Sequence, residues 1–228
     1  MELEARLYAE DADGQIWMSP AKTTNIRDYL GGRLTATNNK VSQRTLAADM
    51  LNYGAAAQLL MDYDTEHLVN EELTAEQLAK LRQYETKTLP VVEKTNSNYR
   101  PAGQSNILFN SVSLDNEVIL TLTVRADEGK DVKVLMKDHE SGTVLETLKT
   151  ERVGNNYVVN YSGIGADKMR FAYDFVVQID GTETGNVRTW SIEGYVGEIR
   201  SSGHPKQIAM ANALLTYGDS VAAYFAAQ

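Results

Sequence analysis

The sequence contains no cysteine among its 228 residues, which excludes disulfide bonds, thiol catalysis and thiolate metal ligands. The absence of cysteine from a chain this long fits an exported protein of a Gram-positive bacterium, although a cytosolic protein can also lack cysteine. No apolar run approaches the ~20 residues of a membrane-spanning helix, so we expect no membrane span. The N-terminus has no basic or apolar region of signal-peptide type. If the protein is secreted, we expect its signal and any wall anchor to lie outside this chain.

Clusters of basic residues are also missing, and the formal net charge is −9. An acidic surface repels phosphate backbones, and no Lys/Arg run of nucleic-acid-binding type occurs. Nucleic acid is therefore excluded as an expected partner. With 43% hydrophobic and 23% charged residues, the chain has the composition of a globular protein that can bury a core.

Two long amphipathic helices are predicted, over about residues 42–61 and 205–225. Apolar residues recur at steps of three and four in both, which is the spacing of one helix face. Pro205 suits a first helical turn, where its missing N–H would have no partner. The faces expected to pack on a core consist of Leu46, Met50, Tyr53, Ala57 and Leu60 in the first helix, and of Met210, Leu214, Tyr217, Val221 and Tyr224 in the second.

The two helices are also similar in sequence, which predicts an internal repeat. Aligned in register, identical residues fall at Gln43 and Gln207, Ala47 and Ala211, Leu51 and Leu215, and at Tyr53-Gly54 and Tyr217-Gly218. Upstream, Thr23, Ile26, Tyr29 and Gly31 match Thr189, Ile192, Tyr195 and Gly197, and Asp13-Gly14 matches Asp180-Gly181. Each copy is thus predicted to contain a strand, a turn, a strand, a short turn and a long helix. A glycine inside a helix costs ~1 kcal/mol relative to alanine, so its recurrence indicates close approach of another backbone.

Between the copies, Thr74 and Gln77 form a capping-box pattern that begins a shorter helix over about residues 75–84. Polar residues and two prolines then indicate a linker. From residue 107 apolar residues alternate with polar ones, for example at Leu120, Leu122 and Val124, and turn residues separate these runs. This pattern predicts an antiparallel β-sandwich.

The fold class is therefore predicted as α+β, with immunoglobulin-like antiparallel β-sandwich units that are each followed by an amphipathic helix. We expect a tandem repeat whose first copy is incomplete. Residues 1–86 would form this first unit, a hairpin plus two helices. Residues 87–106 would form the linker, and residues 107–228 the complete second unit.

The sequence resembles the C-terminal modules of large secreted and cell-surface proteins of gut-type Gram-positive bacteria. The resemblance rests on residues 49–58 (DMLNYGAAAQ), 113–120 (SLDNEVIL), 163–169 (GIGADKM), 191–195 (SIEGY) and 213–225 (ALLTYGDSVAAYF). It implies an association with other modules of a parent protein. It implies no catalytic residue, because such modules have none assigned.

Each candidate catalytic or metal-binding pattern has a simpler structural explanation. Ser19 and Lys22 match the Ser-x-x-Lys motif of penicillin-binding enzymes, but the two partner motifs are absent. His67, His139 and His204 lie in dissimilar polar contexts and none has a second histidine at ligand spacing. We therefore assign no catalytic, cofactor-binding or metal-ligating residue, and we expect no cofactor.

Two acidic segments are candidate calcium sites. Asp62, Asp64 and Glu66 alternate with other residues as the carboxylates of calcium loops do. The segment lacks the glycine and the distal glutamate of an EF-hand, so the sequence favours a polar loop after a helix and leaves calcium binding as an open alternative. Asp11, Asp13 and Gly14 are explained by a hairpin turn.

The sequence favours a non-enzymatic structural or adhesion module at the cell surface. The alternative is a carbohydrate-binding module attached to a secreted enzyme, since tyrosine and tryptophan rings, among them Trp17 and Trp190, can stack on sugars. The expected partners are upstream modules, another copy of the chain, or a polysaccharide or host surface. Two strands, at about Leu3–Glu10 and Gln15–Met18, would form a marginal hairpin with open edges. We expect this hairpin to pair with residues 88–93 or with a second copy.

Overall fold

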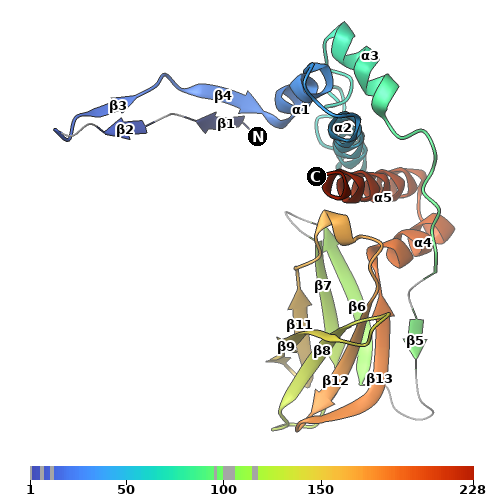
Figure 1. The fold of residues 1–228 in the computed structure, drawn as a ribbon. Coiled ribbons are helices and arrows are strands. Elements are labelled where there is room, and N and C mark those ends of the chain that lie inside the picture. The colour runs from blue at the N-terminus through green and yellow to red at the C-terminus, as the bar shows by residue number, and fades with distance from the viewer. Residues whose placement is uncertain (1, 6–7, 11–12, 95–96, 100–105, 115–117) are drawn as a thin grey trace. The chain divides into compact units, whose positions relative to one another are not determined.

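The computed structural model describes residues 2–5, 8–10, 13–94, 97–99, 106–114 and 118–228 (Figure 1). These residues form a mixed α+β fold with five α-helices and antiparallel sheets. The chain divides into two compact units. The first comprises residues 1–89 and 223–228, and the second comprises residues 90–222.

The first unit begins with a long β-ribbon. Its strands are β1 (Glu2–Ala5), β2 (Tyr8–Glu10), β3 (Ile16–Met18) and β4 (Lys22–Asn25). β1 pairs with β4 and β2 pairs with β3, both antiparallel, and the described strands form no other pairs. The hairpin was predicted, but β4, which follows Pro20, was not.

Three helices follow the ribbon: α1 (Ile26–Thr35), α2 (Val41–Met61) and α3 (Ala75–Tyr84). α1 begins because the side chain of Asn25 accepts a hydrogen bond from the Asp28 N–H at 2.8 Å. The predicted capping box of α3 is confirmed, since Thr74 and Gln77 bond to each other's backbone N–H. The short turn predicted after Ile26 is wrong, because these residues form a ten-residue helix.

The core of this unit lies between the three helices and consists of Leu30, Leu34, Ala47, Ala48, Leu51 and Leu81. The face predicted for α2 is therefore wrong by about one position. Leu46, Met50 and Tyr53 are only half-buried, whereas α2 buries the neighbouring face that carries Ala47, Leu51 and Ala55. Small alanines allow the neighbouring helices to approach closely along that face.

The second unit contains two antiparallel sheets in a sandwich-like arrangement (Figure 1). One sheet has the order β10 (Glu151–Val153), β11 (Asn156–Tyr161), β7 (Val118–Val124), β6 (Ile107–Leu114). The other has the order β5 (Ser97–Tyr99), β13 (Thr182–Trp190), β12 (Tyr173–Ile179), β8 (Val132–Asp138), β9 (Val144–Lys149). The predicted alternation is confirmed, since Leu120, Leu122, Val124, Val134, Phe175 and Val177 are fully buried.

A 3-10 turn, η1 (Ala166–Lys168), connects β11 to β12, and the helices α4 (Ile192–Ser202) and α5 (Pro205–Ala226) follow the last strand. The predicted turn at Asp180-Gly181 is confirmed. Both residues have positive φ, 50° and 79°, as a two-residue hairpin requires. The second short turn, predicted after Ile192, is wrong, because it is the eleven-residue helix α4.

The order strand, shorter helix, longer helix occurs in both units, as β4–α1–α2 and as β13–α4–α5. The two long helices also begin alike. The Gln43 Oε1 atom accepts the Lys40 N–H at 2.8 Å, and the Gln207 Oε1 atom accepts the His204 N–H at 2.9 Å. Tyr53 and Tyr217, expected to be largely buried, are half-buried.

Candidate functional site

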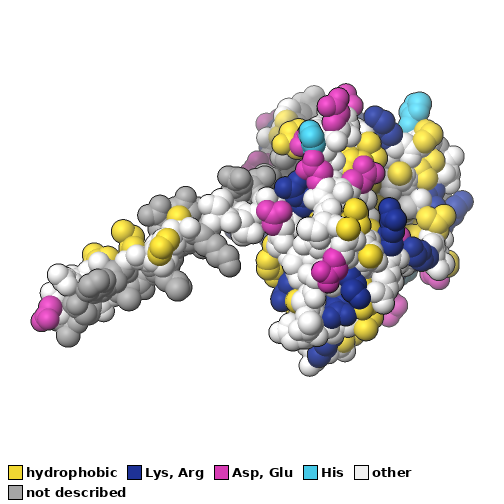
Figure 2. Space-filling model, turned by 90° about the horizontal axis from the view of Figure 1, so that it is seen from above, with side chains coloured by type: hydrophobic (Ala, Val, Ile, Leu, Met, Phe, Trp, Pro, Cys, Tyr) yellow, Lys and Arg dark blue, Asp and Glu magenta, His cyan; other side chains and the backbone are white. Residues whose placement is uncertain are grey.

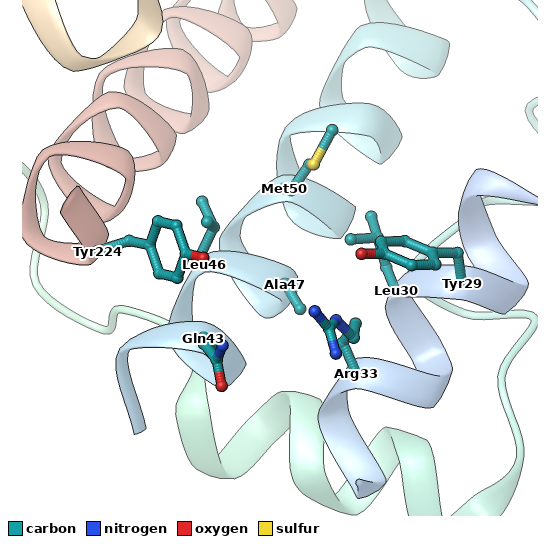
Figure 3. Close-up of a pocket in the computed structure, with 8 residues that line it drawn as sticks. All are labelled: Tyr29, Leu30, Arg33, Gln43, Leu46, Ala47, Met50 and Tyr224. Atoms are coloured by element: carbon teal, nitrogen blue, oxygen red, sulfur yellow. The ribbon is translucent and has the colours of Figure 1, made fainter. Parts of the chain in front are cut away.

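A pocket of about 240 Å³ opens on the first unit along α1 and α2 (Figure 3). Each of the two helices contributes one face to the walls of the pocket. On α2, for example, the lining residues follow Gln43 at steps of three, four and seven positions, which is the spacing of one helix face. The lining residues are Tyr29, Leu30 and Arg33 of α1, Gln43, Leu46, Ala47 and Met50 of α2, and Tyr224 from the segment 223–228 of the same unit.

The floor of the pocket is apolar. Leu30 and Ala47 are buried in the core of the unit, while Leu46 and Met50 are half-buried and border the opening. Met50 packs against the core with part of its surface, and the parts of Leu46 and Met50 that remain exposed line the pocket.

The rim of the pocket carries hydrogen-bond donors. The Arg33 guanidinium lies 5.5 Å from the centre of the Tyr29 ring, and its Nη1 atom donates to Asn39 Oδ1 at 3.4 Å. Figure 3 shows this guanidinium pointing from α1 toward α2. Within the described part of the chain, no carboxylate forms an ion pair with Arg33, whereas Arg27, Arg152 and Arg170 each have at least one carboxylate partner.

The edges of the β-ribbon form a second candidate surface. Figure 2 shows hydrophobic side chains exposed along the ribbon. Of the described ones, Ile16 and Met18 keep 58% and 63% of their surface exposed. The side chains of Leu3 and Leu7, on which the predicted packing partly depended, lie outside the described residues. The expected pairing of residues 88–93 with the hairpin is wrong, because no strand forms there.

Residues 90–93 instead bind to the second unit. Arg170 and Arg200 donate to the carbonyl oxygens of Val91 and Pro90, at 2.7 and 2.8 Å. The Glu93 N–H donates to the buried carboxylate of Glu193 at 3.1 Å. The predicted linker thus contains a segment, which we call the strap (residues 90–93), that is bonded to α4 and to the turn after η1.

An ion-pair cluster lies beneath the strap. Arg170 donates to both carboxylate oxygens of Asp219, at 2.6 and 2.7 Å, and also to Glu193, which is only 4% exposed. The hydrogen bond from Arg170 to Asp219 raises the pKa of the guanidinium above its ordinary value. These contacts connect the turn after η1 to α4 and α5 of the second unit.

The three histidines are dispersed. His67 contacts Glu72, which also pairs with Arg27, and these interactions lower the pKa of Glu72. His139 lies 2.9 Å from Asp174 Oδ1, an oxygen that also accepts the Thr189 hydroxyl. His204 stands at the start of α5.

The other candidate residues form no reactive group either. Ser19 donates to the carbonyl oxygen of Pro20 and lies in the loop between β3 and β4. Asp62 and Asp64 have positive φ after α2, as expected of a polar helix-terminating loop. Trp190 is buried, while the side chain of Trp17, like residues 11–12, lies outside the described residues.

Two kinds of site are absent from the described residues. No group of three or more histidine or acidic side chains is placed to hold a metal ion. No helix there has both the length and the hydropathy needed to span a membrane.

Compared with known proteins, the chain matches no family model, no curated protein and no solved structure. The sequence pattern identified Tyr29 as a position of the repeat, matched to Tyr195, and gave no role to Arg33. Recognising residues 26–35 as a helix would have placed both on one face, four residues apart.

Proposed function

We propose that this chain is a non-catalytic structural or adhesion module of a bacterial surface protein, located toward the protein's C-terminal end. The observation that carries the proposal is the β-ribbon, whose described strands pair only with one another. The sequence motifs at residues 49–58 and 213–225 support the surface location through their resemblance to such modules.

The ribbon supports an assembly role for a physical reason. A two-stranded ribbon is marginal in water, and its outer edges present unpaired N–H and C=O groups that can accept another strand. Exposed Ile16 and Met18 add apolar surface to one of these strands. We infer that the partner is a second copy of this chain, which pairs through its own ribbon.

Sedimentation velocity over a concentration series tests this proposal. We expect the wild-type mass to rise with concentration and Ile16→Lys to suppress the rise, because a charged side chain on a ribbon opposes strand pairing. Val41→Lys is the matched control, since Val41 is 66% exposed but begins α2, outside the ribbon. A wild-type monomer at every concentration, or equal association of all three proteins, would refute the proposal.

A carbohydrate-binding module is the second candidate. Tyr29, which is 51% exposed beside the pocket, is the observation in its favour, because an open aromatic face can stack on a sugar ring. The apolar floor of the pocket argues against it, since it offers no partners for sugar hydroxyls. Affinity electrophoresis in gels containing soluble polysaccharides tests this candidate, and Tyr29→Ala should abolish any retardation.

A further inference from the structure

The polar groups at the rim of the α1–α2 pocket are matched to one kind of ligand. The Gln43 Oε1 atom is already occupied by the Lys40 N–H, so the Gln43 side chain offers its amide N–H groups. Arg33 offers only donors, and the chain supplies no carboxylate among the lining residues. The rim therefore carries no negatively charged side chain, although the whole chain has a net charge of −9.

The guanidinium is also held in place before any ligand arrives. Stacking on Tyr29 and the bond to Asn39 Oδ1 restrict its rotation, and the Asn39 side chain in turn donates to the Arg33 carbonyl oxygen at 2.6 Å. A guanidinium fixed in this way recognises a carboxylate through paired, charge-assisted hydrogen bonds.

We propose that this pocket binds a small organic carboxylate with an apolar body. The carboxylate pairs with Arg33 and accepts a hydrogen bond from the Gln43 amide. The apolar body covers Leu46 and Met50 above the buried Leu30 and Ala47. This inference is independent of the assembly role of the ribbon.

The size of the pocket limits the ligand. At the packing density of protein interiors, ~0.74, a cavity of about 240 Å³ holds about 180 Å³ of atoms, or roughly a dozen non-hydrogen atoms. A ligand of that size, partly open to solvent, binds with a dissociation constant on the order of 0.1–1 mM. The carboxylate 4-phenylbutyrate has this size, and its primary amide has the same shape without the charge.

Ligand-observed NMR titration of the full chain with these two probes tests the proposal. We expect saturation transfer from the protein to 4-phenylbutyrate and at least tenfold weaker binding of the amide, because the amide cannot form the charge-assisted pair. Arg33→Gln should weaken carboxylate binding by at least tenfold. Arg82→Gln, which removes an exposed arginine of α3, should leave it unchanged.

A second pair of variants separates ligand recognition from folding. Gln43→Glu keeps the bond to the Lys40 N–H, because glutamate serves equally well at this position of a capping box, but it places a negative charge at the rim. It should abolish carboxylate binding without reducing the melting temperature. Gln207→Glu makes the same change at the matching position of α5 and should bind like the wild type.

Three results would overturn the proposal. These are equal affinity for the acid and the amide, undiminished binding by Gln43→Glu, and no saturation transfer with either probe at millimolar concentration. Binding of neutral monosaccharides in competition with 4-phenylbutyrate would also overturn it, in favour of a sugar site.

Discussion

The glycines inside the helices allow a quantitative test of how tightly each unit is packed. Gly218 lies within α5, and a Cβ atom added there would lie 2.6 Å from Met169 Sδ and 3.0 Å from the Ala166 carbonyl oxygen. Gly54 is its sequence counterpart in α2, where the added Cβ would meet only Val69 Cγ2, at 2.9 Å. Gly32 in α1 has no atom within 4 Å of the added Cβ.

The three positions should therefore respond differently to alanine. The gain in helix propensity is about 1 kcal/mol at each of them. At Gly32 nothing opposes this gain, so we expect stabilisation by about 0.5–1 kcal/mol. At Gly54 the Val69 methyl must shift, so the net change should lie near zero. At Gly218 a backbone oxygen and a buried methionine must both move, which costs about 1–3 kcal/mol, and we expect net destabilisation of about 1–2 kcal/mol.

Urea unfolding of Gly32→Ala, Gly54→Ala and Gly218→Ala, followed by circular dichroism, measures these differences. The slope of the transition should stay constant, so that the midpoints report stability. The order Gly32→Ala above Gly54→Ala above Gly218→Ala is the expected result. If Gly218→Ala were at least as stable as the wild type, the close approach of η1 to α5 would not limit packing, and the reasoning would be refuted.

Three further predictions concern buried polar groups. Asp49, which is 2% exposed, accepts both the backbone N–H and the hydroxyl of Thr86, at 2.9 and 2.7 Å, so Asp49→Ala should destabilise the protein by about 1–3 kcal/mol in urea unfolding. Arg170→Met leaves the Glu193 carboxylate buried without its cation and should lower stability by about 2–4 kcal/mol, and the double variant with Glu193→Gln should recover part of that loss. Burial raises the pKa of Tyr173 from 10.0 to about 12. The contribution of its protonated hydroxyl to the free energy of unfolding is therefore complete below pH 10 and is lost as the pH rises toward 12. Tyr173→Phe should therefore reduce the loss of stability between pH 10 and 12 by about 1–2 kcal/mol, measured by urea unfolding across that range.

The strands of the sandwich could be predicted because their signals are local. The apolar residues Leu120, Leu122 and Val124 alternate with more polar ones, which matches the two faces of a strand. Asp180 and Gly181 both adopt the positive φ that a two-residue hairpin turn requires, which few other dipeptides do readily. The capping box at Thr74 was visible for the same reason, since both of its bonds lie within four residues.

The errors concern helices whose packing depends on small residues. α1 was interpreted as a turn because Gly31 and Gly32 weaken its helical pattern, although the Asn25 cap was present in the sequence. The buried face of α2 was misplaced because large apolar residues dominate a periodicity argument, whereas the core uses Ala47 and Ala55. The pocket depends on how the consecutive helices α1 and α2 pack and on Tyr224, which is distant in sequence, and no local pattern indicates these contacts.

The strap has a mechanical consequence for a chain that is pulled from its N-terminal side. The first unit ends at residue 89 on that side, and the next four residues are fastened to the second unit through Arg170, Arg200 and Glu193. Tension passing along the backbone therefore reaches these hydrogen bonds before it reaches β6 and the sandwich core. The strap would therefore detach before the sandwich unfolds, and it would release a few residues of extended chain while the two sheets remain folded.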